Sequence, residues 1–293
     1  MANSAIIFGS NGQDGYYLTK QLISLGIKVV CVSRSSGDII GNVGNYNFVS
    51  ALIKNEIPDY IFHFAANSTT KHDVLFDNNE SISTGTINIL EAVKNFSPGT
   101  KVFISGSAMQ FKNDGNKINI NSEFDHSSLY SVARIHSVFV SRYYRDKYKL
   151  KVYIGYLFNH DSPLRSEDHI NQKIVKTALR IKNGSHEKLE IGNLNVQKEF
   201  NFAGDIVNAI WLFINQDKVY EIILSSGILH SIKSWIMLCF EECGLNWENH
   251  VIVSESYKPE YFKLYGDSEG IRSLGWYPMF DIQKLARLML NNK

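Results

Sequence analysis

Three side chains in the middle of the chain have types and spacing suited to proton transfer. Tyr130 and Arg134 lie four residues apart in a stretch of helical periodicity, so they share one helix face. A guanidinium beside a phenol stabilises the phenolate and lowers the tyrosine pKa from about 10 toward the working range. Such a tyrosine can exchange a proton with a carbonyl or hydroxyl oxygen, which the hydroxyl of Ser107 could orient. By itself, the spacing is more typical of a surface tyrosine beside a solvated arginine, so its context decides.

That context begins with a glycine-rich turn near the start of the chain. Gly9, Gly12 and Gly15 follow an apolar run at 5–8, which predicts a strand buried on both faces, and a helical pattern starts directly after them. Backbone N–H groups and the positive end of a helix attract phosphate, and glycines allow its close approach. The order of strand, glycines and helix predicts a dinucleotide-binding turn. The alternative is a tight turn that binds nothing.

The end of the second predicted strand, 28–32, indicates which dinucleotide would bind. An acidic residue at this point accepts from the ribose hydroxyl of NAD, whereas a basic residue accommodates the 2′-phosphate of NADP. Here the strand leads into Arg34 and Ser35, with no carboxylate before Asp38. We therefore expect NADP(H) rather than NAD(H), with Arg34 on the phosphate and Ser35 as a hydroxyl donor. The alternative is that Arg34 is a solvated loop residue.

Strands and helices alternate up to about residue 158, which predicts an α/β fold with a Rossmann-type doubly wound parallel sheet. The predicted strands are 5–8, 28–32, 60–66, 101–105 and 152–158, and helices are predicted at 48–55, 79–96 and 129–148. The stretch 37–47 leaves little room for a strand. Ala65 and Ala66 are small enough to let a cofactor lie close, and His63 is expected to be packed rather than reactive.

After residue 158 the regular alternation of strands and helices ends, and we expect a smaller C-terminal α/β lobe over the carboxyl edge of the sheet. Residues 1–158 would form the NADP-binding domain, and residues 159–293 would mainly form the substrate lobe, with some segments returning to the sheet. Helices are predicted at 170–182, 205–215, 232–243 and 282–290, and short strands at 189–192 and 198–202.

Composition narrows the class of protein. The 293 residues carry 30 basic and 29 acidic side chains, so nothing favours a nucleic acid or a membrane surface as partner. The chain leads directly into a strand and has no apolar run of about 18 residues, so we expect no signal peptide, no transmembrane helix and a cytoplasmic location. Cys239 and Cys243 fit reduced core cysteines better than a metal or disulfide site, so no bound metal is expected.

The whole chain resembles the extended short-chain dehydrogenase/reductases that modify nucleotide sugars, most of all the GDP-mannose 4,6-dehydratase group. The likeness rests on residues 9–18, 34–36, 157–165, 178–211 and 266–276. It implies a GDP-sugar substrate and a homodimer or dimer of dimers formed through helices 79–96 and 129–148. Val138, Phe139 and Tyr143 could supply that seam, although core packing explains them equally well.

The resemblance also assigns roles to individual residues. The catalytic set would be Ser107, Tyr130 and Arg134. Cofactor binding would involve Gly9, Asn11, Gly12, Gln13, Asp14, Gly15, Arg34, Ser35, Ala65, Ala66, Tyr130 and Arg134. Substrate binding would involve Ser68, Ser107, Asn159, Arg165, Lys173, Lys198 and Glu260.

Several positions depart from the dehydratase pattern. Met109 stands where the group has a glutamate that works as acid and base in the 4,6-elimination, and a methionine cannot move a proton. Arg134 replaces a lysine, so the charge is kept but the cation effectively never deprotonates. Phe111 replaces the usual tyrosine, Lys198 replaces a common arginine, and the chain is shortened around 37–47.

These departures lead to three hypotheses. The first is an NADPH-dependent reductase of a nucleotide-linked 4-keto-(deoxy)sugar in bacterial-type surface-sugar biosynthesis, probed by NADPH oxidation. The second is an epimerase, C4 dehydrogenase or 4,6-dehydratase of the same fold that keeps its cofactor through turnover. The third belongs to another class, a catalytically silent protein that binds a nucleotide sugar or NADP.

Overall fold

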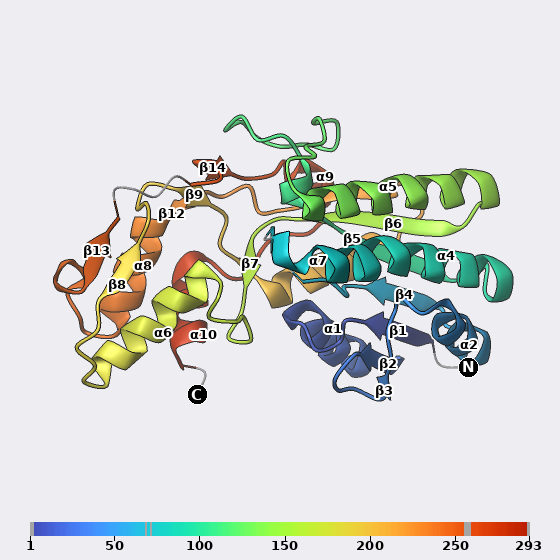
Figure 1. The fold of residues 1–293 in the computed structure, drawn as a ribbon, viewed down its shortest axis with the longest axis horizontal. Coiled ribbons are helices and arrows are strands. Elements are labelled where there is room, and N and C mark those ends of the chain that lie inside the picture. Colours follow the sequence, from blue (N-terminus) through green and yellow to red (C-terminus); the bar gives the residue numbers. More distant parts are fainter. Residues whose placement is uncertain (1–2, 68, 71, 255–258, 292–293) are drawn as a thin grey trace.

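The centre of the molecule is a sheet of seven parallel strands in the order β11-β6-β5-β4-β1-β2-β3, with helices on both faces (Figure 1). The structure is a computed structural model that describes residues 3–67, 69–70, 72–254 and 259–291. The sheet confirms the predicted fold class. Its strands are β1 (Ser4–Phe8), β2 (Lys28–Ser33), β3 (Ile39–Ile40), β4 (Tyr60–His63), β5 (Lys101–Ser107), β6 (Lys151–Leu157) and β11 (Glu221–Leu224).

Both faces of the sheet are covered because its central strands are apolar on both sides. In β1, Ile7 packs in one core cluster with residues of α1 (Gln13–Ser24) and α7 (Ala203–Ile214). Ile6 points the other way, into a cluster with residues of α2 (Tyr46–Glu56) and α4 (Gly85–Phe96). Successive side chains of a strand alternate between faces, so a continuous apolar run is what a strand between two helical layers requires.

A smaller lobe follows the sheet and holds its own apolar cluster (Figure 1, left). Its helices are α6 (Ile170–Lys182), α8 (Ile232–Glu242) and α10 (Ile282–Asn291), and its short strands are β8 (Leu189–Ile191), β9 (Gln197–Lys198), β12 (His230–Ser231), β13 (Val251–Val253) and β14 (Lys263–Leu264). The strand pair β7 (His160–Asp161) and β10 (Asn201–Phe202) lies between this lobe and the sheet.

The predicted elements are present, with differences at their ends. The stretch 37–47 does hold a strand, β3, because two residues are enough to pair with the end of β2. The carboxylate of Asp38 accepts from the backbone N–H of Cys31 at 2.8 Å, which holds β3 against the sheet edge. No strand is predicted from the sequence at β11, although its apolar run resembles the runs that form the other strands. Strand 198–202 is interrupted at Glu199 and Phe200, so it forms parts of β9 and β10.

The helix predicted at 79–96 begins earlier and is irregular. It starts with α3 (Leu75–Asn78), continues through a π-helical segment, Asn79–Thr84, and becomes regular in α4. α5 (Leu129–Tyr148) has the predicted bounds. Along α5, Val138 is in the core and is not available for a dimer seam, whereas Phe139 and Tyr143 are exposed.

Two further features concern the cysteines and the apolar character of the helices. All three cysteines are free, and Cys239 and Cys243 are buried in the smaller lobe. Within the described part of the chain, no helix combines the length and the apolar character needed to cross a bilayer.

The carboxylate of Glu199 ties the smaller lobe to the end of β11. It is fully buried and accepts from the backbone N–H groups of Ser226 and Gly266, each at 2.8 Å. It also accepts from the hydroxyls of Ser225 and Ser226 and from the side-chain amide of Asn201. A buried carboxylate with this many donors is costly to remove, because each donor would be left without an acceptor.

We therefore expect Glu199→Ala to lower the free energy of unfolding by about 3 kcal/mol or more. The measurement is urea unfolding followed by circular dichroism. Glu190→Ala is the matched control, because Glu190 lies nearby in β8 with an exposed side chain, and it should change stability by less than about 0.5 kcal/mol. Equal effects of the two substitutions would show that the buried Glu199 network contributes no more to the free energy of unfolding than an exposed glutamate does.

Candidate active site

The turn between β1 and α1 is shaped by contacts that only glycine permits. Gly9 has φ +87°, and a Cβ there would lie 2.6 Å from the backbone nitrogen of Ala65. A Cβ on Gly15 would lie 2.6 Å from the carbonyl oxygen of Gly9, so α1 packs directly on the turn. Gly12 caps α1, and no side chain caps the helix start. The first N–H groups of α1 are thus left available to an anionic ligand.

A cavity of about 210 Å³ opens beside this turn. Of the residues predicted to bind the cofactor, seven line it: Gly9, Asn11, Gly12, Arg34, Ser35, Ala65 and Ala66. A cradle of bare backbone and small side chains, next to a helix start, fits the diphosphate of a dinucleotide. Gly15 does not line the cavity but lies against the backbone of Gly9 and Ser10. Gln13 and Asp14 do not line it either.

Arg34 and Ser35, the residues predicted to meet the ribose of the cofactor, follow β2 and line this cavity. The amide of Asn11 donates to the hydroxyl of Ser35 at 3.1 Å. Arg34 is half exposed and forms a loose ion pair with Asp77 at 3.9 Å. An exposed pair of this kind is weak, so Arg34 is free to exchange Asp77 for a phosphate group. The preference for NADP stays a prediction.

Tyr130 and Arg134 form one buried unit at the start of α5. The Nε of Arg134 donates to the phenolic oxygen of Tyr130 at 3.2 Å, and its Nη1 donates to the hydroxyl of Ser105 at 2.9 Å and to the Ser105 carbonyl. β5 runs on to Ser107, two residues beyond its predicted end, and this places the Ser107 hydroxyl beside the phenol. The predicted catalytic residues are therefore brought together in the structure.

Burial raises the pKa of Tyr130, but the opposing contacts outweigh it. The charge of Arg134 and hydrogen bonds from Ser107 and Arg134 favour the phenolate, and the net pKa of Tyr130 lies below its ordinary value of 10. Ala66, which lines the glycine-turn cavity, packs against the small apolar cluster of Ile82, Tyr130 and Ala133, so Tyr130 and the glycine-lined cavity share a neighbouring cluster.

Met109 forms an apolar wall beside the phenol. It packs against the cluster that contains Tyr130 and also against the cluster that contains Phe111. Its thioether offers neither a proton nor a charge at this position. Met109 therefore cannot act as an acid or a base beside Tyr130.

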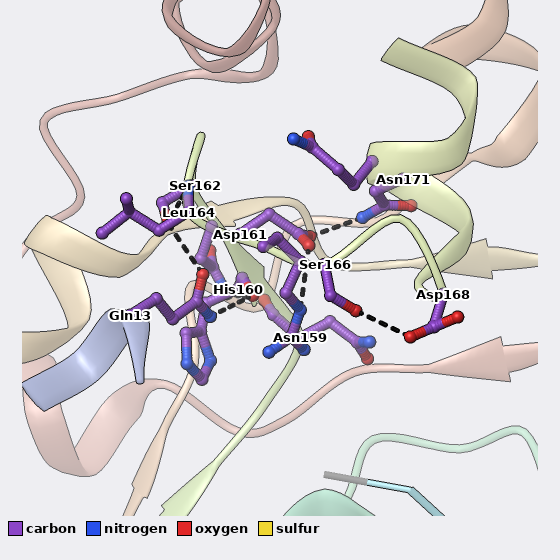
Figure 2. A network of polar contacts seen from close by, with 12 residues as sticks. Gln13, Asn159, His160, Asp161, Ser162, Leu164, Ser166, Asp168 and Asn171 are labelled. Atoms are coloured by element: carbon purple, nitrogen blue, oxygen red, sulfur yellow. Dashed lines mark hydrogen bonds and ion pairs between the residues drawn. The ribbon is translucent and has the colours of Figure 1, made fainter. Parts of the chain in front are cut away.

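The side chains of Gln13 and Asp14 turn away from the cavity and contact the segment after β6. Figure 2 shows Gln13 donating to the carbonyl of His160 at 3.1 Å and accepting from the hydroxyl of Ser162 at 2.9 Å. The carboxylate of Asp14 pairs with Nε2 of His160 at 2.8 Å. The roles predicted for Gln13 and Asp14 in cofactor binding thus rest on their backbone N–H groups.

In the Asp14–His160 pair the imidazole is buried and the carboxylate is partly buried, and each partner shifts the pKa of the other. Burial opposes the charge of Asp14, but the charge and hydrogen bond of His160 outweigh it, so the pKa of Asp14 is lowered. Burial likewise opposes the charge of His160, but Asp14 outweighs it, so the pKa of His160 is raised. Arg165 and Arg134 add further positive charge around Asp14.

A second cavity, of about 430 Å³, lies in the smaller lobe and collects three of the residues predicted to bind substrate: Lys173, Lys198 and Glu260. Burial lowers the pKa of Lys198 to about 8, with Asp161 opposing the shift and Arg165 adding to it. Glu260 accepts from the hydroxyl of Thr70 at 2.9 Å. A residue of the N-terminal half of the chain therefore contacts a residue that lines this cavity.

The other predicted substrate residues occupy different places. Arg165 pairs with Asp161 at 3.5 Å, and its positive charge acts to lower the pKa values of both Tyr130 and Lys198. Asn159 uses its backbone carbonyl to accept from Asn201. Ser68 is outside the described residues.

Sequence reasoning missed two residues of the site, His160 and Ser162, and placed His63 correctly. His63 is buried, and burial lowers its pKa to about 3. The only signal for His160 and Ser162 was their place in the segment 157–165, because a partner 146 residues away cannot be inferred from local pattern. The described residues include no cluster of His, Cys, Asp and Glu that could hold a metal ion.

The family model described as GDP-mannose 4,6 dehydratase matches residues 6–289 of the chain.

Individual relatives cover nearly the whole chain. GDP-mannose 4,6 dehydratase 1 of Arabidopsis thaliana is 30% identical over 319 residues, covering 98% of this chain and 88% of its own. The human GDP-mannose 4,6 dehydratase is 27% identical, covering 99% and 91%.

Solved structures share the fold at low sequence identity. RMD from Pseudomonas aeruginosa, complexed with NADPH, has a TM-score of 0.87 at 17% identity, covering 99% of this chain and 98% of its own. dTDP-glucose 4,6-dehydratase from Bacillus anthracis, in complex with NAD, has a TM-score of 0.86 at 15% identity, covering 100% and 98%.

The geometry of the turn leads to a prediction for Gly9→Ala. Positive φ and contact with Ala65 should together abolish measurable NADPH binding and lower the melting temperature. Gly26→Ala is the matched control, because Gly26 also has positive φ, at +75°, but no atom within 4 Å of a Cβ. It should cost about 1 kcal/mol of stability and leave NADPH binding intact, as measured by fluorescence titration. Normal NADPH binding by Gly9→Ala would contradict the assignment of the turn.

Proposed function

The chain belongs to the GDP-mannose 4,6-dehydratase family, in the extended class of short-chain dehydrogenase/reductases, and we propose that it reduces a nucleotide-linked 4-keto-6-deoxy-sugar with NADPH. It is an NAD(P)-dependent nucleotide-sugar enzyme of that class. The fold neighbours were solved with NAD or NADPH, and some with UDP-sugars, whereas the relatives in sequence are named for GDP-mannose. A GDP-sugar is therefore the substrate we favour.

The main support for reduction is the combination of an acidic phenol with an apolar neighbour. Tyr130 retains the cation and the hydroxyl that make it a proton donor, while Met109 offers no group for removing water from the sugar. A methyl group at C6 of the sugar suits the Met109 wall, since a hydroxyl there would lose its hydrogen bonds to water without gaining a partner.

In the proposed reaction, Tyr130 gives its proton to the carbonyl oxygen of the sugar while a hydride is added to the carbonyl carbon. NADPH, when bound, supplies that hydride. Ser107 holds the oxygen during transfer, and Arg134 stabilises the phenolate that is left. The phenolate then regains a proton from solvent, which returns the site to its starting state.

The names of the relatives support a second candidate, a 4,6-dehydratase that retains its cofactor. Against it stands Met109, because the elimination needs an acid and base near C6. The partly buried carboxylate of Asp14 does not fill that role, because its side chain turns away from the glycine-lined cavity and its charge is matched by His160. A homodimer through α4 and α5 is part of the proposal, supported by the exposed Phe139 and Tyr143.

The decisive experiment is to incubate the protein with NADPH and GDP-4-keto-6-deoxy-mannose and to follow NADPH by absorbance and the sugar by mass spectrometry. We expect one NADPH oxidised per sugar reduced, and at least about a 100-fold loss in Tyr130→Phe. Tyr148→Phe, at the far end of α5, is the matched control and should keep full activity. Absence of NADPH oxidation with this and with UDP- and dTDP-linked 4-keto sugars would overturn the reductase proposal. Conversion of GDP-mannose without net NADPH turnover would establish the dehydratase instead.

Lys198 should make nucleotide binding dependent on pH. Its amine is charged below a pKa of about 8 and neutral above it, so attraction to a diphosphate is lost as pH rises through that value. We expect the affinity for GDP, measured by calorimetry, to fall about fourfold between pH 7 and 8.5.

The control for this measurement is a pair of lysine substitutions. Lys198→Arg should remove the pH dependence, because a guanidinium stays charged throughout the range. Lys173→Arg, on the wall of the same cavity, should leave it unchanged. A flat profile in the unmodified protein would place the diphosphate away from Lys198.

A further inference from the structure

The contacts between the start of α1 and the segment after β6 form a buried polar connection between the two ligand sites. It consists of four side chains, Gln13, Asp14, His160 and Ser162, which we call the α1–β7 latch. Gln13, His160 and Ser162 are each at least nine-tenths buried. Three hydrogen bonds of 2.8 to 3.1 Å join the two sides. The two bonds made by Gln13 are drawn in Figure 2. Buried bonds of this kind are costly to break singly, because each leaves a polar group without a partner.

The first end of the latch lies at the cofactor turn. Gln13 and Asp14 are the first two residues of α1, and their backbone N–H groups belong to the helix start that faces the glycine-lined cavity. A diphosphate bound there restrains the same residues whose side chains hold His160 and Ser162.

The second end of the latch reaches the walls of the cavity in the smaller lobe. Between His160 and Ser162 lies Asp161, whose carboxylate accepts from the side-chain amide of Asn171 at the start of α6. The carbonyl of Asn171 accepts from the indole of Trp235 on α8 at 3.1 Å. α6 and the first residue of α8 line the second cavity, so the position of Asp161 bears on its shape.

Asp14 and His160 of the latch also interact electrostatically with two arginines near the ligand sites. The imidazole of His160 faces Asp14 and the Phe158 carbonyl and also experiences the charge of Arg165. Asp14 in turn experiences His160, Arg165 and Arg134, the cation that stabilises the phenolate of Tyr130. One partly buried carboxylate thus balances cations that belong to the cofactor side, the reacting centre and the substrate side.

We propose that the α1–β7 latch couples the two binding events, so that a bound NADPH tightens the binding of a nucleoside diphosphate and the reverse. His160 and Ser162 act as positioning residues for the segment that carries Asp161 and Arg165. Either ligand stabilises the latched arrangement, and the second ligand then binds to an arrangement already formed. The inference rests on the two ligands of the proposed function and is independent of the reaction.

The test is calorimetric titration of GDP into the full chain, with and without saturating NADPH. We expect GDP to bind at least about fivefold tighter in the presence of NADPH, and NADPH to gain the same factor from GDP. In Asp14→Asn the factor should fall below twofold. In Ser162→Ala, which removes one bond of the three, it should fall to an intermediate value.

Ser141→Ala is the matched control for Ser162→Ala. Ser141 is also fully buried, but among the described residues its hydroxyl has no hydrogen-bond partner. It should keep the full coupling factor, which separates the latch from a general loss of stability. Thermal melts of each variant identify any that fails to fold.

Two outcomes would overturn the latch proposal. One is an unmodified protein in which NADPH does not strengthen the binding of GDP. The other is coupling that is unchanged in both Asp14→Asn and Ser162→Ala. Coupled binding in a protein that oxidises no NADPH would refute the reductase and leave the latch standing.

Discussion

The structure of the site depends on a buried positive charge, the guanidinium of Arg134, held between a phenol and the end of a strand. Arg134 is nine-tenths buried, and such a charge is tolerated only with partners on several sides. The carbonyl of Ser105 in β5 accepts a hydrogen bond from the guanidinium, and the phenolic oxygen of Tyr130 accepts another. Because β5 must bring its carbonyl to this point, the register of the sheet and the start of α5 are tied to the same contact.

Much of the fold could be predicted because its determinants are local. The central strand β1 and the helix α5 follow from apolar periodicity, which depends only on neighbours in the chain. β3 could not be predicted from its composition, because two paired residues leave almost no pattern. The π-helical segment 79–84 holds one apolar residue, Ile82, so its sequence offers no periodicity that could distinguish it from a regular helix.

The candidate site was predictable to the extent that its residues have characteristic types. Glycines at fixed spacing and a tyrosine one turn before a cation stand out in any sequence, whereas His160 and Ser162 acquire meaning only through contacts with Gln13 and Asp14 across the fold. The exposed fraction of Val138 was likewise decided by tertiary packing. Long-range partners of polar side chains are the part that a single sequence hides.

The cation beside Tyr130 is an arginine and not a lysine, and this limits how the tyrosine can regain a proton in the proposed reaction. An ammonium group can release a proton to a neighbouring phenolate and recover it later, but a guanidinium effectively cannot. Arg134 can therefore steady the negative charge on Tyr130 without ever replenishing its hydrogen. In the proposed reaction a new proton would therefore reach Tyr130 through the hydroxyl of Ser107 or from water, so solvent must have access to the site between turnovers.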